Sequence, residues 1–276
     1  MHRIDTSTAQ KDKFGSGKNG FTGGNPQTGE LPTALDADFF DSVQEEIAAV
    51  IEAAGITLAK TNNAQLVAAI KSLTGPGRLL NIQSFPITSN YVPVAGTKKV
   101  RVRAWGAGGA GAGTATAGVG AAGGAGGAYV EVTIDLSGLT SIPITVGKGG
   151  TAVPANSSAS GVAGGDTLIP LLGVTAKGGG GGSAVAAAIG GTPTSSKATA
   201  SLLVKGQDGQ GSAITSIGGQ GGAAFASSAG VARTGSSSDN GGYPGGASAG
   251  ASYPSGGTPR GSGAGADGLV IIEEYA

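Results

Sequence analysis

The sequence predicts a mainly β protein in which two short N-terminal helices precede a glycine-rich β-sandwich. Three observations support this fold class. Apolar residues recur at steps of three and four only before residue 75. Short runs that alternate apolar and polar residues recur after residue 90. Most of the 56 glycines stand between those later runs, so the glycine belongs to one part of the chain.

The composition excludes several classes of protein. The 17 basic residues balance 17 acidic ones, which argues against the electrostatic footprint of a nucleic-acid binder. No cysteine is present, so neither a disulfide framework nor a thiolate metal site can form. No apolar run approaches the length of a membrane span, so we expect no membrane insertion. The polar start of the chain does not resemble a signal peptide.

Composition shifts divide the chain into four regions. Residues 1–34 are polar and rich in glycine and proline, and are predicted to form an extended arm. Residues 35–75 are predicted to be helical and 76–84 to be a linker. Residues 85–276 contain the strands and the glycine runs.

Two helices are predicted, over 36–54 and 63–73. Asp36 or Asp38 would cap the first helix, and Gly55 follows its end. Its apolar seam is narrow, as in a short coiled coil, and two short helices bury little surface in a monomer. Self-association would cover them, and packing of one helix on the other as a hairpin is the alternative. The association candidates are Phe40, Val43, Ile47, Val50, Leu66 and Ile70.

Seven strands are predicted, separated by glycine and proline, which is typical of a β-sandwich or jelly roll. They are 91–94, 100–105, 129–134, 142–146, 167–171, 202–204 and 269–274.

The glycine runs between the strands are too long for turns. Polyproline-II-like helices of glycine (polyglycine II) have three residues per turn and can pack backbone to backbone, with their amides bonded to neighbours. Residues 123–128, Gly-Gly-Ala-Gly-Gly-Ala, have this period. Flexible linkers are the alternative. If the runs are packed, Gly124→Val and Gly180→Val should both disrupt the fold.

Enzyme and cofactor chemistry find little support. Residues 106–111 match a dinucleotide-binding glycine motif, but residues 113–118 after it are not a convincing helix. His2, the only histidine, lies in the arm, which argues against a Ser-His-Asp triad or histidine metal site in the body. Asp135, Asp166, Asp208, Asp239 and Asp267 are scattered without evident pairing, and most are interpreted as turn formers. We expect no catalytic residue, no cofactor and no metal.

The segments between the glycine runs would gather at the ends of such a bundle. They are rich in serine, threonine, alanine and asparagine, with a few tyrosines and arginines. Rigid aromatic side chains and arginine dominate binding hot spots. The candidates for recognition of a partner are Tyr243, Tyr253, Arg233 and Arg260. The alternative for each tyrosine is a structural role, in which its side chain covers the sandwich or a subunit interface. Trp105 is assigned a structural role at the end of a core strand.

Two resemblances cover nearly the whole chain. Gly29-Glu30-Leu31-Pro32-Thr33 and the run from Asn62 to Ile70 resemble the virion-proximal end of tail fibres from tailed bacteriophages. Val102–Gly109, Ile144–Gly150 and Ala266–Tyr275 are similar to glycine-rich fibre tips and adhesins.

The resemblance implies a homotrimeric phage tail fibre, or receptor-binding protein, located in the virion. Residues 1 to about 75 would attach to the baseplate or tail tip, and the glycine-rich tip would bind a glycan, pilus or outer-membrane protein of the host. Two alternatives remain: a structural tail adaptor or spacer without receptor binding, and a surface-polysaccharide depolymerase. The chain has no long β-helical shaft, which disfavours the depolymerase.

Overall fold

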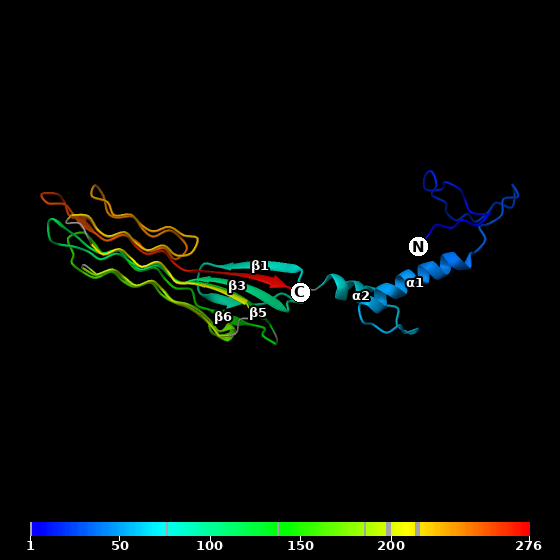
Figure 1. Cartoon of the computed structure of the whole chain (residues 1–276), viewed down its shortest axis with the longest axis horizontal. Coiled ribbons are helices and arrows are strands. Elements are labelled where there is room, and N and C mark those ends of the chain that lie inside the picture. The colour runs from blue at the N-terminus through cyan, green and yellow to red at the C-terminus, as the bar shows by residue number, and fades with distance from the viewer. Residues whose placement is uncertain (1, 76, 137, 185, 197–199, 213–215) are drawn as a thin grey trace. The chain divides into compact units, whose positions relative to one another are not determined.

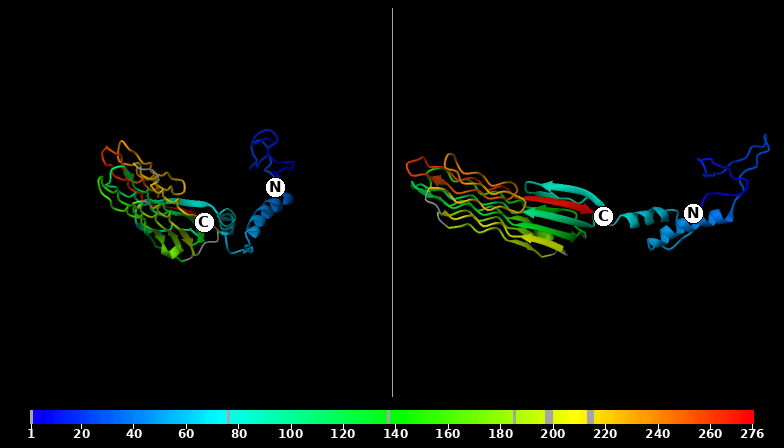
Figure 2. Two further views of the ribbon diagram at one scale, coloured as in Figure 1. Left: turned by 60° about the vertical axis from the view of Figure 1, so that its left-hand side comes forward. Right: turned by 45° about the horizontal axis from the view of Figure 1, so that its top comes forward.

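The computed structural model describes residues 2–75, 77–136, 138–184, 186–196, 200–212 and 216–276. The chain divides into two compact units, Met1–Arg78 and Leu79–Ala276. The first unit holds the helices and the second all of the named strands (Figures 1 and 2). The fold of the described residues is therefore mainly β with two short helices.

The N-terminal unit is an irregular arm followed by a helical hairpin. Single β-bridges, Gln10 to Gly20 and Asn25 to Glu30, fold the arm back on itself. Helices α1 (Ala37–Ala53) and α2 (Gln65–Thr74) lie close to the predicted ranges and pack on each other. Asp36 stands at the N-cap but its side chain makes no capping hydrogen bond. The buried side chains of the two helices are those of Ala48, Ile51, Gln65 and Ala69.

The described residues of the second unit form one large sheet and three small ones. The strands are β1 (Leu79–Phe85), β2 (Ser89–Tyr91), β3 (Lys99–Trp105), β4 (Val119–Gly120), β5 (Tyr129–Asp135), β6 (Ile142–Ile144), β7 (Thr167–Ile169), β8 (Val174–Ala176), β9 (Pro193–Ser195), β10 (Ala200–Val204), β11 (Ser252–Tyr253) and β12 (Leu269–Tyr275). The order of the large sheet is β1-β12-β3-β5-β10, and all its pairs are antiparallel.

The apolar core lies on one face of the large sheet. Alternation in β3 and β5 turns Val100, Val102, Val130 and Val132 inward, and all four are fully buried. The small sheets β2-β6 and β7-β8-β9 supply the residues packed against them, such as Ile144. The result is a two-layered sandwich.

Several predicted boundaries were wrong. Residues 79–84, assigned to a linker, form most of β1, because the exposed edge of β12 accepts a further strand. The strand predicted at 167–171 stops at Ile169, where Pro170–Leu172 form a 3-10 turn. The strand predicted at 91–94 lies instead at 89–91. Strands β4, β8, β9 and β11, each of two or three residues, were not predicted.

The glycine-rich segments continue the strands outward as a bundle, in which we include residues 106–128, 147–165, 177–184, 186–192, 205–212, 216–223 and 230–268. Figures 1 and 2 show these segments running side by side away from the sheets. Residues 106–113 leave β3, turn back, and return as 121–128 into β5. Other segments likewise link β6 to β7 and β8 to β9. The bundle is thus a set of long hairpins on a sandwich base.

Backbone hydrogen bonds in the bundle follow a period of three residues. In residues 106–113, every third amide donates to segment 121–128, at 2.9–3.0 Å. The next amide in each triplet donates to segment 159–165. The pairs of the first set are Gly106–Ala128, Gly109–Ala125 and Ala112–Ala122, and those of the second are Ala107–Gly165, Ala110–Val162 and Gly113–Ala159.

A bundle segment also has more neighbours than a strand. Within the described residues, segment 106–113 exchanges backbone hydrogen bonds with six others: 121–128, 147–150, 159–165, 177–183, 245–251 and 263–268. A strand inside a sheet has two such neighbours. A Cβ added to Gly124 would lie 2.3 Å from the Gly109 carbonyl oxygen. Glycine is therefore needed there to let the backbones touch.

Candidate functional site

The bundle has two sets of turns, and only one faces away from the sheets. The described residues of the outer turns are 114–120, 151–158, 184, 186–188, 211–212, 216–217, 232–238 and 252–261, and each turn stands between a segment that leaves the sandwich and one that returns. The turns near residues 224–229 and 243–245 lie on the sandwich side. Residues 185 and 213–215 lie outside the described part of the chain. We call the outer set the distal turns.

Tyr253 and Arg260 lie together in the distal turns. Tyr253 in β11 pairs with Val119 of β4, and the Tyr253 carbonyl accepts the Gly118 amide at 2.8 Å. The Arg260 amide donates to the Ser252 carbonyl at 2.9 Å, which closes the same turn. The Arg260 Nε is buried and has no hydrogen-bond partner in the described chain. Two of the four candidate recognition residues thus share one turn.

Arg233 lies in another distal turn and already has a partner. Its Nε and Nη2 donate to the two carboxylate oxygens of Asp239, at 2.6 and 2.7 Å. This bond raises the pKa of Arg233 and lowers the pKa of Asp239. Both side chains are exposed, so the pair is a surface feature that a ligand can reach.

Tyr243 lies on the sandwich side of the bundle, away from the distal turns. Its neighbour Gly245 donates to the Asp267 carbonyl at 2.9 Å, just before β12 begins. The Tyr243 side chain borders a groove of about 460 Å³, which we call the Tyr243 groove. The pKa of Tyr243 is raised, first by partial burial and then by the nearby Asp267 carboxylate. The sequence candidates therefore divide between the two ends of the bundle.

Three aspartates cap backbone amides at the margin of the bundle, where no described segment supplies a carbonyl oxygen. They were interpreted from the sequence as turn formers, and the structure corrects this. Asp166, Asp208 and Asp267 accept the amides of Gly178, Gly190 and Gly149 at 2.9, 2.7 and 2.7 Å. Each also faces a lysine: the pairs are Lys177–Asp166 (3.9 Å), Lys205–Asp208 (2.7 Å) and Lys148–Asp267 (2.8 Å).

These caps account for recurring dipeptides in the sequence. Each of the three lysines precedes a glycine, and in Lys148-Gly149 and Lys177-Gly178 that glycine donates to the same aspartate that binds the lysine. Gln207 and Gln210 act in a related way, since their Oε1 atoms accept the amides of Ala223 and Gln220. Side-chain oxygens of aspartate and glutamine thus accept backbone amides in place of carbonyl oxygens from a neighbouring segment.

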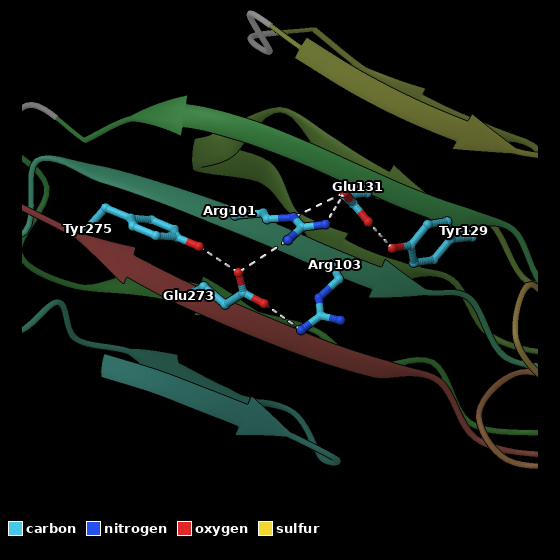
Figure 3. A network of polar contacts seen from close by, with 6 residues as sticks. All are labelled: Arg101, Arg103, Tyr129, Glu131, Glu273 and Tyr275. Atoms are coloured by element: carbon cyan, nitrogen blue, oxygen red, sulfur yellow. Dashed lines mark hydrogen bonds and ion pairs between the residues drawn. The ribbon is translucent and has the colours of Figure 1, made fainter. Parts of the chain in front are cut away.

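The face of the large sheet opposite the core carries a polar network (Figure 3). Arg101 bonds Glu131 at 2.6 Å and Glu273 at 3.5 Å, while Arg103 bonds Glu273 at 2.6 Å. The hydroxyls of Tyr129 and Tyr275 donate to these two carboxylates. Burial alone would raise the pKa of Glu131, but its bonds to Tyr129 and Arg101 lower it overall. With its charges paired, the network orders the sheet surface and offers no free acid or base.

Beside this network, Trp105 has the structural role assigned from the sequence. It is buried against Tyr129, Ala224 and Leu269, and its Nε1 donates to the Phe225 carbonyl at 2.8 Å. Residues 106–111, which match a dinucleotide-binding motif, form a bundle segment, and the described residues after them form no helix.

One group of side chains has the composition of a metal site. Ligand atoms of His2, Asp5 and Asp36 lie within 4.8 Å of one another. His2 Nε2 is 3.7 Å from an Asp36 carboxylate oxygen, which is within ion-pair distance when the imidazole is protonated. His2 and Asp5 are exposed, so we assign no metal to the group.

The six association candidates remain partly or largely accessible in the single chain. Phe40, Ile47 and Ile70 are 47%, 42% and 47% exposed. Val43, Val50 and Leu66 are half-buried. The buried residues of α1 and α2 are Ala48, Ile51, Gln65 and Ala69, so the candidate positions keep accessible apolar surface although the two helices pack on each other.

Comparison with known proteins identifies the second unit. A family model described as a glycine-rich domain matches residues 84–275, which is more than half of the chain. The chain belongs to this glycine-rich domain family. It is also similar to the uncharacterized protein StfP of Escherichia coli (strain K12), with 62% identity over 73 residues. That stretch is 26% of this chain and 35% of the relative, so the chain spans about a third of the relative's length.

Sequence reasoning missed the residues around Tyr243 in this glycine-rich domain. Asn240, Asp267 and Ile87 line the same groove but stand far apart in the sequence. A usable signal was present in Asp267, which resembles Asp166 and Asp208 in closely following a glycine.

Neither α1 nor α2 has the length and apolar composition needed to cross a membrane.

Proposed function

We propose that this chain is a phage tail fibre, or receptor-binding protein, of the virion that attaches to the tail through its N-terminal unit and binds the host surface through its glycine-rich domain. The observation that carries the proposal is the bundle itself. Its hydrogen-bonded backbones hold the distal turns at one end of a rigid scaffold. Loops on rigid scaffolds are where binding residues concentrate.

The distal turns offer a surface suited to recognition. Their side chains are mostly small and polar, and Tyr253 with Arg260 supplies an aromatic ring and an arginine from one turn. Tyr253 and Arg260 are both half-buried, so each residue keeps some surface that a ligand can reach. Tyrosine and arginine are enriched among residues that contribute most to binding energy. We therefore place the principal receptor contacts at this end.

We further propose that the bundle segments are polyglycine-II helices. The amides of segment 121–128 donate in rotation to three neighbours, and segment 106–113 shows two sets with the same period of three. The donors to segment 245–251 are Ala121, Gly124 and Gly127, and those to 177–183 are Ala122, Ala125 and Ala128. A threefold helix requires this repeat. A β-strand would alternate its partners with a period of two.

We also propose that the fibre is a homotrimer formed through α1 and α2. Phe40, Ile47 and Ile70 are exposed in the single chain, although the hairpin already buries Ile51 and Ala69. Contact between copies would remove this apolar surface from water, at about 25 cal/mol per Å². Trimers, and several fibres per particle, would multiply weak contacts through avidity.

Adsorption competition with the purified full chain tests the binding role. We expect the protein to bind host cells and to block attachment of the particle that carries it. Tyr253→Ala with Arg260→Ala should weaken the block at least tenfold without changing the melting temperature. A folded, trimeric protein that neither binds nor competes would favour a structural adaptor. Release of reducing ends from purified surface polysaccharide would instead reveal a depolymerase.

Light scattering tests the oligomer. We expect three copies for the full chain, and a shift towards monomer for the double variant Ile47→Glu, Ile70→Glu. Glu52→Lys, an equally drastic charge change at an exposed position of α1, is the matched control and should remain trimeric. A monomeric full chain would contradict the association proposal and leave the binding role to be judged by adsorption alone.

A further inference from the structure

The Tyr243 groove lies where the bundle meets the sandwich, apart from the distal turns. Its walls come from the turn after β1, which contributes Pro86 and Ile87, and from two bundle segments. Those segments are fixed to each other, because the Gly241 amide donates to the Ala264 carbonyl at 2.9 Å. The volume, about 460 Å³, falls within the range of about 300–1,000 Å³ typical of small-molecule sites.

The groove has exposed apolar surface. Tyr243 is 54% exposed and Ile87 is 60% exposed. The Tyr243 hydroxyl makes no hydrogen bond within the described chain, so its polar end is free to bond a ligand. An aromatic ring of this kind presents a flat apolar face together with a polar tip.

The polar groups of the groove are fixed and still have bonding capacity. Asn240 Oδ1 accepts the Ala264 amide at 2.8 Å, which leaves the Nδ2 group as a donor without an acceptor among the described residues. Asp267 accepts from Gly149 and from Lys148, one bond per oxygen, and its side chain is 38% exposed. Each carboxylate oxygen can accept a further bond.

From this arrangement we infer that the Tyr243 groove binds a saccharide. A pyranose ring has an apolar face of C–H groups and a rim of hydroxyls. Tyr243 and Ile87 match the face, while Asn240, Asp267 and the tyrosine hydroxyl match the rim. The Lys148–Asp267 pair balances its own charge, which suits a neutral sugar better than an anionic polymer. A nucleic-acid backbone is disfavoured, because a carboxylate lines the groove.

This inference deepens the proposed host-binding function, on which it rests for the origin of the sugar. It adds a lateral glycan site to a fibre whose principal contacts we place at the distal turns. A sugar held at the side would let the particle rest on surface polysaccharide while the distal turns engage the receptor.

The test measures binding of the full-length protein to an array of purified bacterial O-antigen and core oligosaccharides. We expect binding to at least one glycan, with saturation transfer from tyrosine protons to sugar C–H protons. Tyr243→Ala should reduce affinity at least tenfold, and Asn240→Ala about threefold or more. Ile189→Ala, which removes an exposed apolar side chain outside the groove, is the matched control and should bind as the parent does. Circular dichroism verifies that all variants are folded.

The outcomes separate this inference from the proposed function. If the protein blocks particle adsorption but binds no glycan, the groove inference is wrong and the fibre proposal stands. If a glycan binds equally well to the parent, Tyr243→Ala and Asn240→Ala, the saccharide site lies elsewhere and the inference is again wrong. If the protein neither binds glycan nor blocks adsorption, both proposals fail.

Discussion

The sandwich and the bundle are two parts of the same hairpins, yet different atoms hold them together. In the sandwich, side chains such as Val102 and Ile272 fill the space between layers. In the bundle, almost no side chain lies between neighbouring segments, and a Cβ added to most of the glycines would collide with a carbonyl oxygen of another segment. One region is stabilised mainly by buried apolar area and the other by backbone hydrogen bonds in several directions.

This difference determines what each region tolerates. A core of side chains can adjust to a substitution by repacking, at a cost of a few kcal/mol. A backbone lattice has no such freedom, because moving one segment breaks hydrogen bonds with several others. Turns attached to the lattice are therefore held firmly, while their own sequences are free to differ.

The largest expected effect is from Gly124→Ala. The new methyl would lie 2.3 Å from the Gly109 carbonyl oxygen and 2.5 Å from its carbon. We expect a loss above about 4 kcal/mol, which is near the limit for single substitutions and a large part of a typical stability. The protein should be insoluble or should melt far below the parent by differential scanning calorimetry.

Gly180→Ala is the matched control in a neighbouring segment. Its Cβ would meet the Ile189 oxygen at 3.1 Å and nothing closer, so we expect a loss of about 1 kcal/mol or less. The sequence alone predicted that valine disrupts the fold at both positions, whereas the space around the two glycines differs in the structure. Equal melting temperatures for the two alanine variants would contradict the account of the bundle as backbones in contact.

A second pair of substitutions compares how much stability each region loses when buried side-chain carbons are removed. Ile272→Ala removes three carbons from a fully buried core position and should cost about 2–5 kcal/mol. Ala125→Gly removes a fully buried methyl from the bundle and should cost about 1–2 kcal/mol, from lost burial and added chain entropy. Denaturant unfolding measures both. A larger loss for Ala125→Gly would mean that alanine methyls, not backbone contacts, hold the bundle.

The two regions also differ in how well the sequence predicts them. Strands β3, β5 and β12 follow from alternation, and α1 and α2 from helical spacing, because a side-chain pattern defines each. Strands β4 and β11 could not be found, since a two-residue strand exists only through its partner. In the bundle the sequence shows a repeat of glycine, but it does not indicate which segments pack together, because glycine carries no side chain to specify a neighbour.

The same limit applies to the candidate site. Tyr253 and Arg260 were selected by residue type, and their common turn brings them close in sequence as well as in space. Tyr243 was selected for the same reason, but its groove partners Asn240, Asp267 and Ile87 depend on long-range packing. Buried Glu274 is a further example: it accepts bonds from Gln83, Val94 and Thr97, which no local pattern indicates.

A pH titration should distinguish the margin of the bundle from the sandwich core. The pKa of Asp208 is lowered in the folded protein, first by the Gly190 amide and then by Lys205. The stability from this cap is present above the unfolded-state pKa of about 3.9 and is lost as pH falls through the lower folded-state pKa. We expect the melting temperature to decrease below about pH 4.

Asp208→Asn identifies the contribution of this cap. The amide oxygen can still accept the Gly190 amide, but the charge that binds Lys205 is gone. The variant should therefore melt slightly lower than the parent at neutral pH and show a smaller decrease on acidification. An unchanged acid profile would assign the pH dependence to other carboxylates, such as Asp267.

The smallest effect on stability is expected for Arg233→Ala, at the exposed end of the bundle. Its bond to Asp239 is bidentate, yet both side chains are in solvent, and surface ion pairs contribute little. The melting temperature should not change measurably. If the distal turns bind the host, adsorption should nevertheless fall several-fold, because the guanidinium is lost from the contact surface. Arg233→Lys should restore part of the adsorption if charge matters, and none if the planar two-bond geometry is required. A lower melting temperature with normal adsorption would instead make Arg233 a structural residue of its turn.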